Sequence, residues 1–457
     1  MKKSFLSLLA IMFGFVLVLS ACGDDTPAVV DGEIGGTLRI MSFMDDPLIM
    51  ATYFTYYHPE VEIDFIMTGM SEGAYQQQLQ LMLAGGNDVP DIVMLDSSFV
   101  RQFVESPFMS DLSDMSDILE GLDIFQFTTD AGTHNGQIRA ISHQAAPGVM
   151  YYRRSLAQRY FGTDDPAIIQ EHFRDMDAFL KSARTIGELS NGNTFTVSSH
   201  IELSNLFFAN RATPWIVDNT LMIDPILHQY LDIAASLRHE GLEAEIGTWG
   251  GEWYASFSDT MVDAHGNNRQ IFGYFLPTWG LSHPLMDSAG DTAGDWALIP
   301  GPLPYQWGGA WFAIPNNSNN QVTARAFLEF VFTEDFMTKW ASGYFTNERL
   351  LAIDSSLPET LQFSGDFVSS QRVVENVAPM MVGTPSYYFV GGQNPHDVFA
   401  QVSPYVSLDH IQATDFILNA AWTEAVTQYV SGELSREAAI QSFIDSVLID
   451  LPDLQIQ

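Results

Sequence analysis

Strand-type and helix-type spacings of apolar residues alternate along residues 37–95 of the chain. Apolar residues run together or alternate with polar ones in three segments, and recur every three or four positions between them. This spacing predicts strands over residues 37–41, 61–66 and 90–95, and helices over residues 48–57 and 75–84. The order strand-helix-strand-helix-strand predicts a doubly wound α/β unit, with its third strand buried in a parallel sheet.

Helical spacing dominates the rest of the chain. It predicts helices over residues 165–189, 205–211 and 226–240, and again over the last stretch, residues 413–457. Strand patterns return at residues 149–152, 271–276 and 311–314. We find no fixed-period repeat and no low-complexity segment.

The first 22 residues carry the pattern of an export signal. Lys2 and Lys3 precede an apolar run over residues 5–19, and small residues lead from that run to Cys22. The run is too short and wrongly flanked for a stable membrane span, so residues 1–21 are predicted to be a cleaved signal peptide. The Leu-Ser-Ala-Cys ending resembles the lipobox of bacterial lipoproteins. An ordinary signal peptide with a chance cysteine is the alternative.

The lipobox resemblance implies acylation of the Cys22 thiol after cleavage. The protein would then be held by its lipid on the extracytoplasmic face of the cell membrane, and several acyl chains on one residue would anchor it stably. Residues 22–36 are small, acidic and without periodicity, which predicts a tether between the lipid and the fold.

Composition and charge narrow the candidate partners. The formal net charge is −37, with 19 basic against 56 acidic residues, so nucleic acid and anionic lipid headgroups are poor partners. A hydrophobic content of 46% is ample for a folded core in spite of this charge. The chain has a single cysteine, so its stability must come from packing and not from disulfides.

The order of several short segments resembles extracellular solute-binding protein family 1, the carbohydrate-uptake type related to maltose-binding protein. The segments that carry the resemblance are Tyr75–Leu95, Ala146–Arg154, Trp296–Pro302, Gly308-Gly309, Ala326–Phe330 and Ser431–Ala438. The resemblance covers nearly all of the chain after residue 36, and it rests on the order and spacing of these pieces.

The resemblance implies a two-lobe periplasmic-binding-protein fold of the α/β class. Each lobe would be a doubly wound sheet, and hinge strands would join the lobes. We expect lobe 1 to comprise residues 37–148 and 278–333, and lobe 2 to comprise residues 149–277 and 334–457.

The function implied is capture of a mono- or oligosaccharide in the cleft between the lobes. Delivery to an ABC permease with separate ATPase subunits would follow, since the chain has no phosphate-binding Gly-Lys-Ser/Thr loop of its own. We expect a monomer that is not an enzyme and that needs no cofactor and no metal.

Four polar residues are candidates for hydrogen bonds to sugar hydroxyls. Asp45 follows the first predicted strand and Asp96 follows the third, at the sheet edge where ligands of parallel sheets bind. His143 and Gln144 lie in the segment predicted to cross between the lobes. The alternative for the aspartates is helix capping or solvation, and a lone histidine is usually structural.

Aromatic residues supply the second set of candidates, because the C–H faces of pyranose rings pack on flat aromatic surfaces. Trp249, Trp279, Trp307 and Trp311 lie in or beside predicted loops, and Gly309 would let a ligand approach the backbone. The alternative for each tryptophan is core packing.

Three other functions stay open at this point. Residues 69–73 fit the Gly-x-Ser-x-Gly pattern of a hydrolase nucleophile, although a serine cap of the following helix explains them equally well. A secreted carbohydrate-active enzyme would need a carboxylate pair, which only spatial separation defines. Tyrosine pairs at residues 56–57, 151–152 and 387–388 are of the kind used by ferric-ion-binding relatives. No histidine spacing indicates a zinc site.

Overall fold

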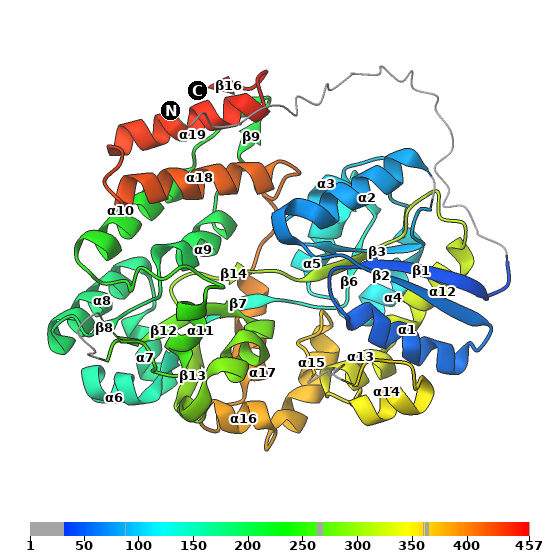
Figure 1. Cartoon of the computed structure of the whole chain (residues 1–457), viewed down its shortest axis with the longest axis horizontal. Helices are drawn as coiled ribbons and strands as arrows, with labels where there is room; N and C mark the ends of the chain where they lie inside the picture. Colours follow the sequence, from blue (N-terminus) through cyan, green and yellow to red (C-terminus); the bar gives the residue numbers. More distant parts are fainter. Residues whose placement is uncertain (1–31, 87, 263–267, 360, 362–364, 457) are drawn as a thin grey trace, which may run out of the picture.

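The computed structural model describes residues 32–456, except residues 87, 263–267, 360 and 362–364. The predicted signal peptide, Cys22 and the tether up to residue 31 therefore lie outside the described residues. Within the described ranges, no helix is long and apolar enough to cross a membrane. The chain forms two lobes that lie side by side (Figure 1).

The sheet of lobe 1 has five strands in the order β2-β1-β3-β15-β6. Strand β1 pairs in parallel with β2 and β3, and β15 runs antiparallel to β3 and β6. The strands are β1 (Gly36–Ser42), β2 (Val61–Met67), β3 (Ile92–Asp96), β6 (Ile141–Ser142) and β15 (Ala310–Ala313). The first three follow the predicted strand-helix-strand order, and their apolar residues form the core of the lobe.

Helices cover both faces of this sheet (Figure 1). They are α1 (Asp46–Tyr57), α2 (Ala74–Gly85), α3 (Val100–Val104), α4 (Ser116–Gly121), α5 (Gln126–Gly132), α12 (Gln321–Val331), α13 (Glu334–Ala341), α14 (Asn347–Ile353) and α15 (Gln371–Val377). Tyr75 of α2 joins two strands, because its hydroxyl donates to the Met41 carbonyl and accepts from the Met94 N–H. The left-handed Gly86 ends α2, as the sequence predicts.

Residues 334–377 pack with lobe 1, although the predicted boundaries gave residues 334–457 to lobe 2. Helix α14 contacts α1, and α13 contacts α12 and α15. Phe336 and Trp340 of α13 belong to the same apolar core as the strands of lobe 1. The boundary was placed too early, since an amphipathic helix shows in sequence that it packs but not against which lobe. The predicted start of the second lobe 1 segment at residue 278 also comes too early, because residues 296–299 and 305–306 pair with the central strand of lobe 2. The other predicted boundaries stay a proposal.

Lobe 2 is built around the long, buried strand β7 (Pro147–Arg153). β12 (Gly273–Pro277), β13 (Trp296–Ile299) and β14 (Tyr305–Gln306) all pair with β7 antiparallel. This sheet therefore differs in strand direction from the mainly parallel sheet of lobe 1. A short parallel pair, β8 (Thr194–Phe195) with β11 (Gln270–Ile271), continues it outward.

Helices enclose the sheet of lobe 2 and form the C-terminal layer. They are α6 (Arg154–Phe161), α7 (Pro166–His172), α8 (Met176–Ser190), α9 (Ser204–Ala209), α10 (Pro225–His239), α11 (Gly251–Phe257), α16 (Pro385–Phe389), α17 (Pro395–Val402), α18 (Asp415–Val430) and α19 (Arg436–Asp450). The remaining short strands are β4 (Thr133–His134), β5 (Gln137–Ile138), β9 (Ile216–Val217), β10 (Thr220–Leu221) and β16 (Gln455–Ile456). The predicted helix over 165–189 is two helices, because Asp175 caps a new one.

The chain crosses between the lobes at least three times. It passes from β6 to β7, returns from β14 to β15, and passes again after α15 toward α17, which contacts β7. The return crossing contains Gly308 and Gly309, both with positive φ. These crossing segments form the floor of the space between the lobes.

Candidate ligand-binding site

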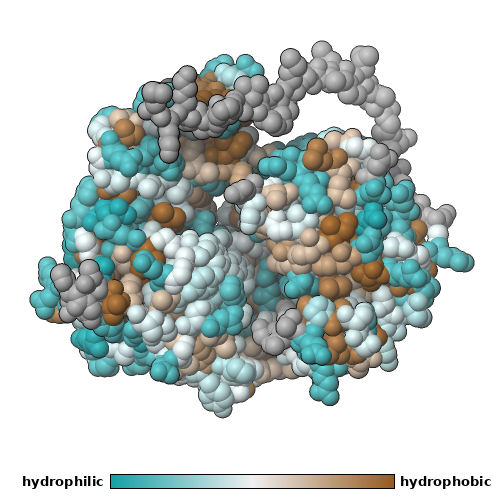
Figure 2. Space-filling model, viewed as in Figure 1, coloured by the Kyte–Doolittle hydropathy of each residue, from teal (hydrophilic) through white to brown (hydrophobic). Residues whose placement is uncertain are grey.

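A cavity of about 950 Å³ lies between the two lobes. We call it the main cavity, and the space-filling view shows a hollow between the lobes in the centre of this face (Figure 2). It is lined from lobe 1, from lobe 2, from the crossing segments and from α18. Its volume is at the upper end of the range for pockets that enclose a small organic ligand.

The lobe 1 wall is formed at the carboxyl end of β3, where Asp96, Ser97 and Ser98 line the main cavity. Oδ1 of Asp96 accepts hydrogen bonds from the Ser98 N–H at 2.9 Å and from the Ser98 hydroxyl at 2.6 Å. Burial raises the pKa of Asp96 above its ordinary value. Asp96 thus braces the turn after β3 and also borders the main cavity, and its role toward a ligand stays a proposal.

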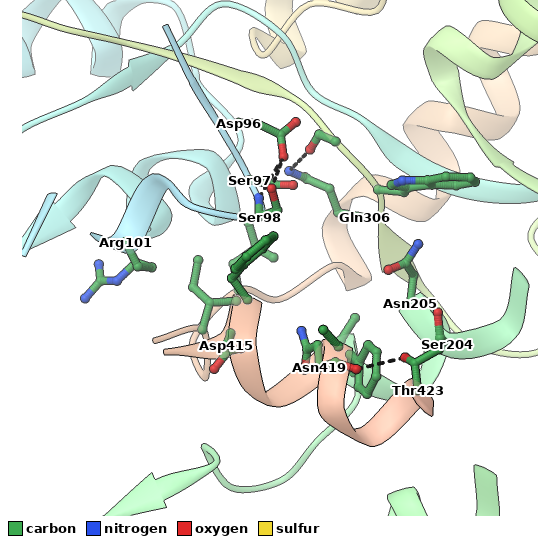
Figure 3. Close-up of a pocket in the computed structure, with 18 of the residues that line it drawn as sticks. Asp96, Ser97, Ser98, Arg101, Ser204, Asn205, Gln306, Asp415, Asn419 and Thr423 are labelled. Carbon is green, nitrogen blue, oxygen red and sulfur yellow. Dashed lines mark hydrogen bonds between the residues drawn. The ribbon is translucent and has the colours of Figure 1, made fainter. Parts of the chain in front are cut away.

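The lobe 2 wall carries polar side chains on α9 and α18, facing Asp96 across the cavity (Figure 3). Ser204 and Asn205 come from α9, and Asn419 and Thr423 come from α18. Sequence reasoning missed these residues. A signal was present in α18, where four wall residues with polar side chains recur at intervals of four and so share one helix face: Asp415, Asn419, Thr423 and Thr427.

Three tryptophans form one side of the main cavity. The Trp249 and Trp279 rings are stacked, with centroids 6.1 Å apart and planes 13° apart. The Trp307 ring stands on edge to both, at 6.0 Å from Trp249 and 5.6 Å from Trp279. Nε1 of Trp279 donates to the Trp307 carbonyl at 3.0 Å, which fixes its ring. The structure therefore brings three of the four predicted tryptophans together.

A second cavity of about 390 Å³ adjoins the main cavity and shares Asp96, Trp279 and Gly308 with it. We call it the second chamber. Its remaining lining residues are Phe43, Met44, Asp46, Gln144, Ser282, Gly309, Gly365 and Asp366. Gln144 and Gly309, both predicted site residues, therefore border this chamber and not the main cavity.

Three predicted site residues lie elsewhere. Trp311 is fully buried in the core of lobe 1, where Nε1 donates to the Thr128 carbonyl at 2.8 Å. It points to the far side because neighbours along a strand alternate. Asp45 is exposed at the start of α1 and lines neither cavity, whereas Asp46 lines the second chamber. His143 is only 2% exposed and packs beside Phe312.

The arginines near the cavity are already paired with carboxylates. Nη2 of Arg211 lies 2.5 Å from Oδ2 of Asp415, and both residues line the main cavity. Burial raises the pKa of Asp415 to about 6, against the lowering effect of Arg211. Arg101, which also lines the main cavity, is paired with Glu105 at 2.9 Å. The sites of both arginines are therefore charge-compensated, which does not favour an anionic ligand.

Other sequence patterns receive structural explanations. Ser71 begins the 3-10 turn Ser71–Gly73 that leads into α2. Tyr151 and Tyr152 are buried on β7, and burial raises the pKa of each. In the part of the chain that the structure describes, no cluster of three His, Cys, Asp or Glu side chains is arranged to hold a metal ion.

The sequence matches the bacterial extracellular solute-binding proteins over residues 51–348, which is more than half of the chain. The chain belongs to this family. Members of the family are binding proteins that act outside the cytoplasm. Among curated proteins, no sequence matches the chain.

Solved structures share the fold of this solute-binding protein. An extracellular solute-binding protein of family 1 has a TM-score of 0.72 at 18% identity, covering 90% of this chain and 98% of its own. The ABC-transporter-associated binding protein of B. animalis subsp. lactis, in complex with β-1,6-galactobiose, has 0.67 at 16% identity, with 93% and 100% covered. The sugar-binding protein MalE of Xanthomonas citri has 0.65 at 14% identity, with 89% and 95% covered. The predicted two-lobe α/β fold is confirmed.

Proposed function

We propose that this solute-binding protein captures a mono- or oligosaccharide in the main cavity. The tryptophan wall carries the proposal: Trp249, Trp279 and Trp307 present flat, partly exposed aromatic surface beside polar side chains from both lobes. Sugars offer the matching chemistry, since C–H faces pack on aromatic rings while the hydroxyls at the ring edge form hydrogen bonds.

The sugar ligands of proteins with the same fold support this proposal. The B. animalis protein was solved with a galactobiose, and the X. citri protein is described as sugar-binding. Sequence identities of 16% and 14% indicate a shared fold but not a shared ligand. The argument for a sugar therefore rests on the side chains of this chain.

Import is the role that we assign to the capture. Ligand bound between the lobes would favour the closed arrangement, and the closed form would dock on an ABC permease powered by separate ATPase subunits. The lipobox ending at Cys22 supports a lipid anchor on the extracytoplasmic side, with the protein as a monomer tethered near its permease.

We propose binding without turnover. Asp96 is engaged by Ser98, and Asp415 is paired with Arg211, so these wall carboxylates have structural partners. Release of product from a glycan, lost when one wall carboxylate is removed, would instead support a secreted carbohydrate-active enzyme. A visible absorption band on iron loading would support a ferric-ion binder.

Thermal unfolding of the chain from Gly23 onward tests the proposal with mono- and oligosaccharides, Fe³⁺, amino acids and peptides as probes. A ligand at 100 times its dissociation constant adds about 2.7 kcal/mol to the free energy of unfolding. We expect a raised Tm with one family of sugars and no new product in the same samples. A shift with iron or a peptide but with no sugar would contradict the sugar proposal and leave the fold unaffected.

A further inference from the structure

The second chamber is rich in hydrogen-bond acceptors. Three carboxylates from three separate segments line it: Asp46 at the start of α1, Asp96 at the end of β3 and Asp366 between α14 and α15. Among its described lining residues there is no arginine and no lysine. The second chamber therefore concentrates negative charge directly beside the main cavity.

The groups that face these carboxylates do not neutralise them. Asp366 accepts from the Gln144 side-chain amide and from the Phe367 N–H, which are both uncharged donors. Within 4.0 Å of these carboxylates, the one basic side chain in the described part of the chain is His143, whose Nε2 lies 3.9 Å from Oδ2 of Asp46, beyond hydrogen-bond distance. Both ring nitrogens of His143 are buried and have no hydrogen-bond partner in the described part of the chain.

Gln306 gives an independent indication at the junction of the two cavities. Its side chain is 7% exposed, lines the main cavity and donates from Nε2 to the Gly308 carbonyl at 3.0 Å. Its Oε1 is buried and has no donor among the described residues. Figure 3 shows this amide reaching toward Asp96. A buried acceptor without a donor costs free energy, which a donor on the ligand would recover.

We infer that the second chamber and its junction bind a protonated primary amine on the ligand, so that the sugar is an amino sugar or an oligosaccharide that ends in one. This inference rests on the proposed function, because it places the rest of the sugar against the tryptophan wall. An ammonium group has three donors and no acceptor, which matches walls made of acceptors, whereas a hydroxyl brings one donor and two acceptors.

The positive charge of an ammonium group further favours it over a neutral hydroxyl in the second chamber. Hydrogen bonds between an ammonium and a carboxylate are about twice as strong as those between neutral groups. Burial, together with the nearby charge of Asp46, raises the pKa of Asp366 to about 7, and burial raises the pKa of Asp96. Burial is the largest cause of both shifts and no cation is among the causes, so a bound ammonium would supply the positive charge that these carboxylates lack.

Matched sugars test the inference by isothermal titration calorimetry at neutral pH, where a primary amine is still protonated and Asp366 is not fully protonated. Each set contains the amino sugar, its N-acetyl form and the plain hydroxyl sugar, in the gluco and galacto series and as short oligosaccharides. We expect one amino sugar to bind at least about tenfold more tightly than its acetylated and hydroxyl counterparts.

Two variants localise the effect. Asp366→Asn and Asp46→Asn keep the side-chain size and are each expected to remove most of the preference for the amino sugar over its acetylated and hydroxyl counterparts. Asp117→Asn, on the exposed side of α4, removes the same charge far from the chamber and is expected to keep the preference.

The possible outcomes distinguish failure of the amine inference from failure of the proposed sugar binding. If acetylated or hydroxyl sugars bind as tightly as amino sugars, or if both chamber variants keep the preference, the inference is overturned and the proposed function stands. If no sugar in any set or in the wider panel binds, both the proposed function and the inference that rests on it are contradicted.

Discussion

Trp249 and Trp279 stack with their ring planes 13° apart, although they come from different loops of the chain. Trp279 is fixed by its hydrogen bond to the Trp307 carbonyl, while Trp249 is 46% exposed and has a positive φ of 69°. A backbone conformation that is unfavourable for tryptophan is thus maintained where the ring borders the main cavity. The relationship indicates an aromatic surface that is formed before any ligand arrives.

Trp249→Ala is expected to weaken sugar binding at least about tenfold, because aromatic residues at the centre of a binding surface carry much of its energy. Thermal stability should change little, since nearly half of the side chain is already in solvent. Calorimetric titration with the sugar that stabilises the wild type measures the effect. Tyr56→Ala removes a comparably exposed ring from the end of α1 and should leave affinity unchanged. Equal sugar affinities of Trp249→Ala and the wild type would show that Trp249 does not contribute to sugar binding.

Trp311→Ala is expected to act on stability and not on binding. The side chain is fully buried and bonds to the Thr128 carbonyl, so its loss leaves a cavity and an unpaired carbonyl. Such core truncations lower the free energy of unfolding by about 3–5 kcal/mol. Urea denaturation measures this loss, and titration of the folded protein should give wild-type affinity. A large drop in affinity with unchanged stability would contradict this expectation and show that Trp311 contributes to ligand binding.

The first half of lobe 1 could be predicted closely from local spacing. Predicted strands at 37–41 and 61–66 match β1 and β2 within one residue at each end, and predicted helices at 48–57 and 75–84 match α1 and α2 within two. Local patterns sufficed there because each helix is followed by a clear stop, His58-Pro59 after α1 and Gly86 after α2. The predicted helix start at residue 165 also agrees with the structure, where Asp165 caps α7 and accepts from the Ala167 N–H at 2.9 Å.

The candidate site was only partly predictable, because it is made by contacts distant in sequence. Asp96 and three tryptophans were proposed from chemistry and loop position, and all four border the main cavity. Asp366 could not be proposed in this way, since Gln144 and Asp46 approach it only in the fold. Trp311 lies in the strand that the sequence predicts, but strand alternation turns its ring into the core.

Glu202 is expected to make stability depend on pH. Burial raises its pKa from 4.5 to about 7, and its Oε2 has no donor among the described residues. Because the folded protein holds this proton more tightly, the stabilisation is complete below pH 4.5 and is lost as pH rises through about 7. A shift of this size corresponds to a free energy on the order of 3 kcal/mol.

Glu202→Gln removes that titration and tests the prediction. Relative to the wild type, the variant should gain stability above pH 7, and this gain should shrink as pH falls toward 4.5. Urea denaturation at several pH values measures the difference. A variant destabilised by the same amount at every pH would show that the Ser198 and Trp253 hydrogen bonds to Glu202, and not its charge, dominate.

Cys22→Ser is expected to abolish lipid attachment while leaving the fold intact, since Cys22 precedes every described residue. Metabolic labelling with a radioactive fatty acid, followed by membrane fractionation, measures the change. The wild type should carry the label and sediment with membranes, and the variant should do neither. Equal labelling of the two proteins would rule out Cys22 as the anchor, and an unlabelled wild type would favour an ordinary signal peptide.

Arg211 and Asp415 are expected to stabilise the wall of the main cavity as a pair. Arg211→Met leaves the buried Asp415 carboxylate without its cation, and loss of one partner of a buried ion pair costs about 3–5 kcal/mol. The double variant Arg211→Met with Asp415→Leu should recover most of this loss, because no uncompensated charge remains. Urea denaturation of the wild type, both single variants and the double variant gives the coupling energy. Strictly additive losses would mean that the two side chains contribute through separate packing contacts and not through their ion pair.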